Sequence, residues 1–140
     1  MVCTFFGHRD TYDLERDKLK QAIIKEIEEN GADTFYVGNH GNYDRMVFSV
    51  LKELKDIYTK ISINVVLAYL PKDNSEDLLY TVFPEGIELV PKRFAINFRN
   101  KWMIEQSDMV IAFVQRSFGG AAKFVEMARK KRKTIINLAE

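Results

Sequence analysis

Hydrophobic and polar positions along the chain form two kinds of run, short apolar segments and longer amphipathic ones. The short segments are rich in Val, Ile and Phe, which predicts strands at 2–6, 34–37, 61–70, 109–114 and 134–138. The longer segments carry apolar residues on one face, which predicts helices at 14–29, 43–58, 98–106 and 119–131. This alternation predicts one Rossmann-like α/β domain over residues 1–140, a three-layer sandwich with a mostly parallel sheet.

The segment 71–92 interrupts the alternation. It holds all three prolines of the chain together with many charged residues. We expect a long loop here, with one short helix near 76–82 and a short strand near 87–89. Its role as a lid, an interface or a plain connection stays open.

Composition narrows the class of protein without naming a function. Hydrophobic residues make up 46% of the 140 positions, charged residues 29%, and the net charge is +1. These values are typical of a globular domain and give no global attraction to nucleic acid or membrane. No apolar run reaches the ~20 residues of a membrane span, and no signal-peptide pattern opens the chain. The single cysteine, Cys3, excludes an internal disulfide and is expected to be buried, so we expect a cytoplasmic protein.

Glycine-containing loops follow two of the predicted strands, and a third opens the last helix. They are Gly7-His8-Arg9, Gly38-Asn39-His40-Gly41 and Ser117-Phe118-Gly119-Gly120. Glycine allows the backbone to approach a phosphate closely, and the amides at a helix start favour anions. Parallel α/β sheets bind ligands beyond the carboxyl ends of their strands, so we expect a phosphorylated ligand at this edge.

Polar side chains in the first two loops have two interpretations each. Arg9 is suited to pair with a phosphate, and His8 to hydrogen-bond a ligand or transfer a proton, whereas the alternative is a solvated surface turn. Asp44 is suited to bind a ribose hydroxyl or to favour the first turn of its helix, and both interpretations stay open. His8 and His40 have no third ligand at useful spacing, so no metal is expected.

Arg99 and Glu126 form a further candidate pair. With Arg99 holding a phosphate, Glu126 would stabilise positive charge at a sugar carbon or activate water. Spacing alone favours a solvated Glu126 instead. The basic run at 129–133 ends a helix, where cations complement the helix dipole, so we expect no nucleic-acid ligand there.

Several of these segments resemble one known superfamily. Phe5-Phe6-Gly7-His8-Arg9 resembles the opening of small bacterial proteins in the SLOG superfamily, which groups the DNA-processing Smf/DprA proteins with the LOG phosphoribohydrolases. The segment Arg99-Asn100-Lys101-Trp102-Met103 is similar to the arginine helix of that superfamily. Gly119-Gly120 with Glu126 resembles the second half of its signature, Pro-Gly-Gly-x-Gly-Thr-x-x-Glu.

The resemblance implies roles for particular residues. Arg99 and Glu126 match the pair that cleaves the N-glycosidic bond of nucleoside monophosphates in LOG enzymes, and Gly119 and Gly120 match the phosphate-binding loop. Asn100, which follows Arg99, and Ser117, which opens the third glycine loop, are further ligand-binding candidates. The chain departs from the signature, with residues that replace the proline, the third glycine and the threonine: Phe118, Ala122 and Lys123.

Three functional hypotheses follow. The first is binding of a nucleotide or nucleotide-derived phosphorylated ligand, as in a sensor, without a cofactor. The second is a LOG-like N-glycosidase that acts on nucleoside 5′-monophosphates. The third is a DNA-binding accessory protein of Smf/DprA type, which the near-neutral charge disfavours. The resemblance also implies a homodimer.

Overall fold

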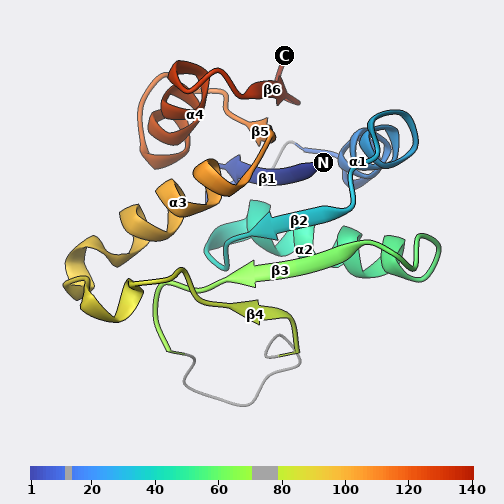
Figure 1. The fold of residues 1–140 in the computed structure, drawn as a ribbon. Coiled ribbons are helices and arrows are strands. Elements are labelled where there is room, and N and C mark those ends of the chain that lie inside the picture. The colour runs from blue at the N-terminus through green and yellow to red at the C-terminus, as the bar shows by residue number, and fades with distance from the viewer. Residues whose placement is uncertain (12–13, 71–78) are drawn as a thin grey trace.

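The fold is described by a computed structural model that covers residues 1–11, 14–70 and 79–140. Figure 1 shows a sheet whose strands run in one direction, and all recorded strand pairs are parallel. The strand order is β4-β3-β2-β1-β5-β6. The strands are β1 (Val2–Gly7), β2 (Thr34–Val37), β3 (Ser62–Val66), β4 (Thr81–Val82), β5 (Met109–Phe113) and β6 (Thr134–Asn137). The sequence-based prediction of a Rossmann-like α/β sandwich is confirmed.

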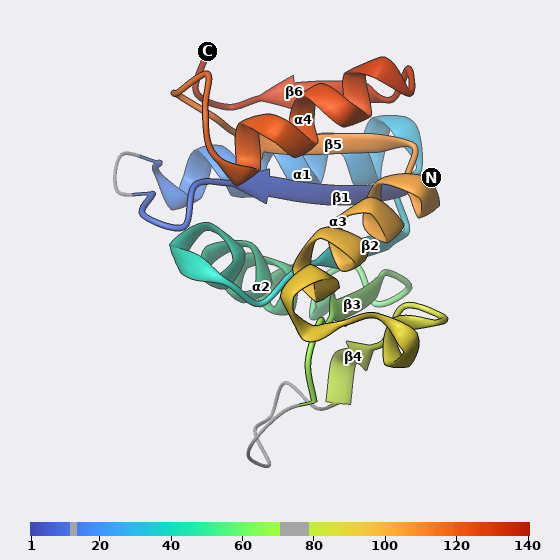
Figure 2. The same cartoon turned by 90° about the vertical axis from the view of Figure 1, so that its left-hand side faces the viewer.

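Helices cover both faces of this sheet. They are α1 (Arg16–Asn30), α2 (Gly41–Lys55), α3 (Ala95–Gln106) and α4 (Gly120–Lys130), and two 3₁₀ turns, η2 (Ile87–Leu89) and η3 (Lys92–Phe94), precede α3. Figure 2 shows α3 and α4 in front of the strands, with α1 behind them. Among the residues described, no helix has the length and apolar character needed to cross a membrane.

A hydrophobic core lies on each face of the sheet, and successive residues of β1 contribute to both cores. Phe5 packs toward α1 and α2 and stacks on Phe35, with ring centres 6.2 Å apart. Phe6 packs toward α3 and α4 and stacks on Phe124, with ring centres 5.7 Å apart. Side chains alternate between the faces of a strand, so a continuous apolar run is what a strand covered on both sides requires. Cys3 is fully buried, as expected, and burial raises the pKa of its thiol to about 12.

The strand order reverses between β1 and β5. The chain adds β2, β3 and β4 on one side of β1, and then returns through α3 to place β5 on the other side. The loops that follow β1 and β5 therefore diverge to opposite faces of the sheet. In open parallel sheets the crevice between two such loops is the usual ligand site.

The segment before α3 differs from the prediction. The residues at 87–89 form the turn η2 instead of a strand, because Ile87 donates its N–H to the Pro84 carbonyl and Leu89 donates to Gly86. Gly86 has a positive φ of 87°, which bends the chain at that point.

The prediction of a short helix near 76–82 is wrong for its last two residues, 81 and 82. Thr81 and Val82 form β4, which pairs in parallel with Val65 and Val66 at the edge of the sheet. Residues 76–78 lie outside the described part of the chain. Thr81 and Val82 are both β-branched, which favours a strand, and pairing with β3 gives their backbone groups hydrogen-bond partners at the sheet edge.

Several element ends shift by a few residues. The third strand ends at Val66, not at 70, although Leu67 and Ala68 are still buried. The apolar run is therefore longer than the strand, because burial continues after the chain has left the sheet. Helices α2 and α3 begin at Gly41 and Ala95, earlier than the apolar periodicity predicts.

Candidate functional site

A cavity of about 620 Å³ opens at the carboxyl ends of β1 and β5, where the strand order reverses. Its walls come from the end of β1, from the loops after these two strands, from the start of α2, and from one side of α3 and the first two turns of α4. Its charged residues among those described are three arginines and two aspartates: Arg9, Arg99, Arg116, Asp10 and Asp44. The polar wall also includes His8, His40, Asn97 and Asn100.

Arg99 is the buried cation of this cavity. Only 2% of the residue is exposed. Its Nη1 atom donates to the Val66 carbonyl at 2.9 Å and to Oδ1 of Asn39 at 3.2 Å, and its Nε donates to Oδ1 of Asn100 at 2.7 Å. A buried guanidinium needs such partners, because an unpaired buried charge costs several kcal/mol. Arg99 therefore ties α3 to the ends of β2 and β3 and supplies a fixed positive charge to the wall.

Asp44 faces the same guanidinium from the first turn of α2. An imagined Cβ on Gly38 would lie 2.8 Å from Oδ2 of Asp44 and 3.1 Å from Nη1 of Arg99, so both side chains fill the space that this glycine leaves. Oδ2 of Asp44 also accepts the backbone N–H of His40 at 3.0 Å. Burial raises the pKa of Asp44 to about 6, although the His40 hydrogen bond and the Arg99 charge both lower it.

We expect Asp44→Asn to stabilise the protein at pH 7.5 by about 1–2 kcal/mol, because ionisation of Asp44 in the folded protein is disfavoured. The asparagine keeps an oxygen that accepts the His40 N–H. A folded-state pKa above the unfolded value of ~3.9 means that stability falls as pH rises from about 4 to about 6. Urea unfolding at several pH values should therefore show the gain shrinking below pH 6 and nearly vanishing near pH 4.

Asp10→Asn is the matched control for this experiment. Asp10 lies at the same cavity but is exposed, and its hydrogen bond from Arg116 lowers the pKa of the carboxyl group. The control should bring no gain in stability at pH 7.5. A loss of stability for Asp44→Asn at that pH, without a pH trend, would show instead that Arg99 holds Asp44 charged.

His8 joins the loop after β1 to the loop after β5. Its Nε2 atom accepts the backbone N–H groups of Gln115 at 3.0 Å and Arg116 at 3.4 Å. An accepting Nε2 leaves the ring proton on Nδ1, so the imidazole is neutral in this arrangement. Burial lowers the pKa of His8, and the charge of Arg116 lowers it further, which favours the same neutral form. His8 therefore positions the backbone that carries Arg116.

Two of the predicted phosphate-loop glycines make room for protein side chains or backbone. A Cβ on Gly7 would lie 2.3 Å from the ring of Tyr43, whose hydroxyl donates to the Ile111 carbonyl at 2.7 Å. Gly41 has a positive φ of 90°, and a Cβ there would lie 2.4 Å from the Cα atom of Arg9. Both glycines are required by packing, whatever their relation to a ligand.

Gly119 and Gly120 differ from these glycines. A Cβ at either position would meet nothing within 4 Å, and both residues line the cavity. Gly119 has a φ of 97°, so its backbone conformation favours glycine. Gly120 has no such requirement and begins α4, whose first amides have no partners within the helix. The bare start of α4 therefore faces the open space of the cavity.

Arg9 and Arg116 supply the exposed cations. Both line the cavity, and Arg116 donates from Nη2 to Oδ1 of Asp10 at 3.1 Å. An exposed pair of this kind contributes little to stability, so Arg116 is available to exchange Asp10 for an anionic ligand.

The structure brings together only part of the predicted set. The residues placed in the cavity wall are Gly7, His8, Arg9, Asp44, Arg99, Asn100, Gly119 and Gly120. Gly38, Asn39 and Gly41 are not among the described lining residues, and they act behind the wall through the contacts given above. Ser117 and Glu126 line a neighbouring groove instead.

Glu126 is exposed and bonded to a residue of its own helix. Its carboxylate accepts from Nη1 of Arg129 at 2.6 Å, one turn further along α4. In the basic run at 129–133, Lys131 contacts Glu105 at 3.6 Å in an exposed ion pair. Glu126 is therefore close to Gly119 and Gly120 in sequence, but its carboxylate does not line the cavity.

Sequence reasoning missed several cavity residues. Arg116, Asp10 and Asn97 line the cavity without having been singled out. Arg116 carried a usable signal, because a cation two residues after a predicted strand lies at the carboxyl edge of the sheet. Asn97 carried none, since its place depends on how α3 crosses the sheet.

Comparison with known proteins does not assign the cavity. No protein-family model matches the chain, and no curated protein matches it significantly. Within the described ranges, no group of three or more His, Cys, Asp or Glu side chains is arranged to hold a metal ion.

Proposed function

We propose that the protein binds a nucleotide or a nucleotide-derived phosphorylated ligand in the cavity between the ends of β1 and β5, and that it acts as a sensor of this ligand. One observation carries the proposal. The bare start of α4, at Gly119 and Gly120, opens onto a cavity that also contains Arg9, Arg99 and Arg116. Unpaired helix amides and arginine side chains are the donors that phosphate oxygens prefer.

The charge balance of the wall supports an anionic ligand. Among the described lining residues, three arginines stand against two aspartates, Asp10 and Asp44, so the cations outnumber the carboxylates. Asp10 is already paired with Arg116. A cavity with this excess of fixed cations attracts phosphate from solution.

Part of the cavity lining is apolar. Ile96, Met103 and Phe124 line the cavity beside the charged groups. An apolar wall with a few convergent polar groups is typical of small-molecule sites, and a volume of about 620 Å³ lies within their usual range. A ligand that has both a phosphate and a flat, weakly polar base matches this combination of charged and apolar groups.

The proposal does not extend to hydrolysis or to DNA processing. The carboxylate expected to cleave an N-glycosidic bond, Glu126, is paired with Arg129 on the exposed side of α4. The placement of Gly119, Gly120 and Arg99 at one cavity supports the SLOG resemblance as a hypothesis about ligand binding.

A thermal-shift comparison of nucleotides with their nucleosides tests the proposal. AMP, GMP, CMP and UMP are each compared with the nucleoside that lacks the phosphate. At ~100 times Kd, binding to the folded state adds about 2.7 kcal/mol, so Tm should rise by several degrees for at least one nucleotide. Its nucleoside should give little or no shift. Equal shifts from nucleoside and nucleotide, or no shift from any nucleotide, would contradict the proposal.

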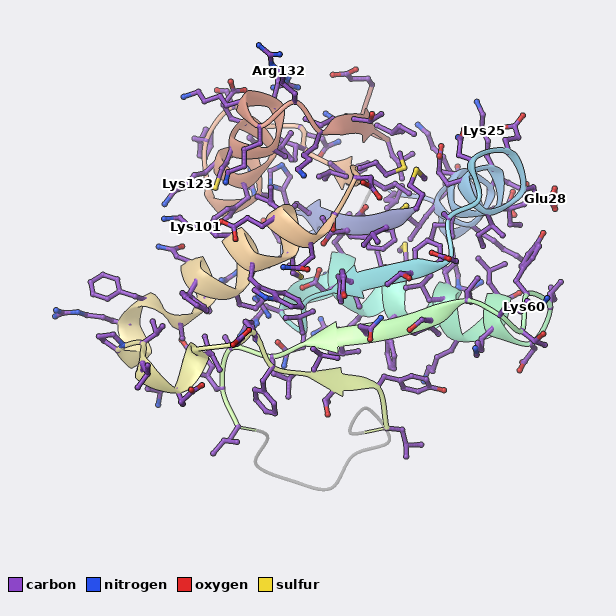
Figure 3. The ribbon with its side chains drawn as sticks, in the orientation of Figure 1. Lys25, Glu28, Lys60, Lys101, Lys123 and Arg132 are labelled. Carbon is purple, nitrogen blue, oxygen red and sulfur yellow. The ribbon has the colours of Figure 1, made fainter. Side chains whose placement is uncertain are left out.

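Arg9→Met provides the site control for this screen. Arg9 is exposed at the cavity, so its removal should leave the unliganded Tm nearly unchanged while reducing the nucleotide shift. Arg132→Met is the matched variant elsewhere, since Arg132 projects from the end of α4 at the top of Figure 3. It should keep the full shift.

A further inference from the structure

A second hollow adjoins the proposed site on the outer side of α4. It is a groove of about 700 Å³ lined by residues of the loop before α4 and of α4 itself. Gly119 lines both this groove and the main cavity. Gly119 and Gly120 have no side chains that could stand between the two spaces, and a Cβ at either position would meet nothing within 4 Å.

The groove has an aromatic side chain at its mouth. Phe118 is 68% exposed, and the guanidinium of Arg116 lies 5.6 Å from the centre of its ring. Arg116 itself lines the main cavity, so this pair spans the boundary between the two spaces. An exposed aromatic ring beside a cation is suited to stack on a nucleic-acid base.

Two lysines give the groove a positive charge. Lys123 and Lys130 both line it, and both are exposed. The ammonium of Lys123 lies 5.4 Å from the ring centre of Phe124, a residue of the main cavity, which places this charge near the boundary. The carboxylate of the groove, Glu126, is bonded to Arg129 and adds little negative charge. The groove therefore favours an anion, as the main cavity does.

We infer that the ligand is a dinucleotide, whose second nucleotide unit lies in this groove. This inference rests on the proposed function, because the first phosphate would occupy the start of α4. The chain of the ligand would cross over Gly119, place its second base on Phe118, and bring a linking phosphate to Lys123. A cavity of about 620 Å³ accommodates one nucleotide, and the adjoining groove provides the space and charge for another.

Isothermal titration with matched probes tests this inference. The probes are the four nucleoside 5′-monophosphates, the corresponding 5′-phosphorylated dinucleotides pNpN, and the dinucleoside 5′,5′-diphosphates NppN. At least one dinucleotide should bind about tenfold or more tighter than its mononucleotide, because stacking and a second phosphate contact add to binding. The two dinucleotide classes distinguish a 3′,5′ linkage from a pyrophosphate linkage.

Two groove variants test whether the added affinity of the dinucleotide comes from the groove. Phe118→Ser and the double variant Lys123→Ser/Lys130→Ser should each remove most of the difference between dinucleotide and mononucleotide, with mononucleotide affinity unchanged. The matched control is Lys25→Ser/Lys60→Ser. Lys25 and Lys60 lie at the right-hand end of Figure 3, far from Lys123 on the left, so this control should keep the full difference.

The outcomes separate the two claims. If mononucleotides bind and no dinucleotide binds more tightly, the groove inference is overturned and the proposed function stands. If a dinucleotide binds more tightly but the groove variants keep the difference, the inference is again overturned. If neither class of probe binds, both claims fail.

Discussion

Gly41→Ala should destabilise the protein by about 2–5 kcal/mol, the sum of a left-handed backbone cost and a steric clash. Gly41 has a φ of 90°, and a Cβ there would lie 2.4 Å from both the Cα and the Cβ atoms of Arg9. The neighbouring hydrogen bond, from the Asn42 N–H to the Arg9 carbonyl at 2.8 Å, holds the two loops at this separation. A backbone contact of this kind has no flexible end that moves aside.

Gly31→Ala is the control that isolates the backbone term. Gly31 ends α1 with a φ of 71°, and a Cβ there would meet nothing within 4 Å. Its substitution should cost only about 1–2 kcal/mol. Denaturant unfolding of both variants gives the comparison. Equal losses for the two variants would show that the loops after β1 and β2 separate readily, and the cavity would then have a mobile wall.

Much of the fold could be predicted from the sequence, because burial and periodicity are local signals. The run that contains Phe5 and Phe6 predicts a strand covered on both faces, and the structure places these two rings in different cores. The segment before α3 was harder, because apolar residues around 87–89 fit a strand and a turn equally well. Pro84 and Gly86 decide between them, since together they favour a turn.

The location of the site could also be predicted, but the roles of its glycines could not. Gly7, Gly38 and Gly41 all look like phosphate-loop glycines in sequence. In the structure their missing Cβ atoms make room for Tyr43, for Asp44 and Arg99, and for Arg9. Except for Asp44, these partners are distant in the chain or come from another loop, so only the assembled fold shows the contacts.

The sequence likewise does not show which charged side chains face the cavity. The resemblance pairs Arg99 with Glu126, whereas spacing alone favours a solvated Glu126; in the structure Arg99 is buried in the cavity wall and Glu126 is exposed. The direction of a side chain depends on the rotation of its helix against the sheet. A shift of one residue along a helix turns the side chain by about 100°, which sequence spacing alone does not resolve for isolated residues.

Gly120→Asp should weaken ligand binding strongly while it leaves the stability of the folded protein unchanged or raises it. An acidic residue in the first turn of a helix stabilises it by about 0.3–1 kcal/mol, and the Cβ at this position meets no neighbour within 4 Å. The same carboxylate would lie where we place the phosphate of the ligand. Repulsion and occupation of that space should weaken nucleotide binding about 100-fold or more.

The most direct measurement is the titration of Gly120→Asp and Gly120→Asn with the nucleoside 5′-monophosphates, alongside their unfolding curves. Asparagine has the same shape without the charge, so it should weaken binding only about three- to tenfold. We predict that the aspartate variant unfolds at the same or a higher denaturant concentration than the wild type and loses nucleotide binding. Unchanged nucleotide affinity in this variant would contradict the claim that the start of α4 binds the phosphate.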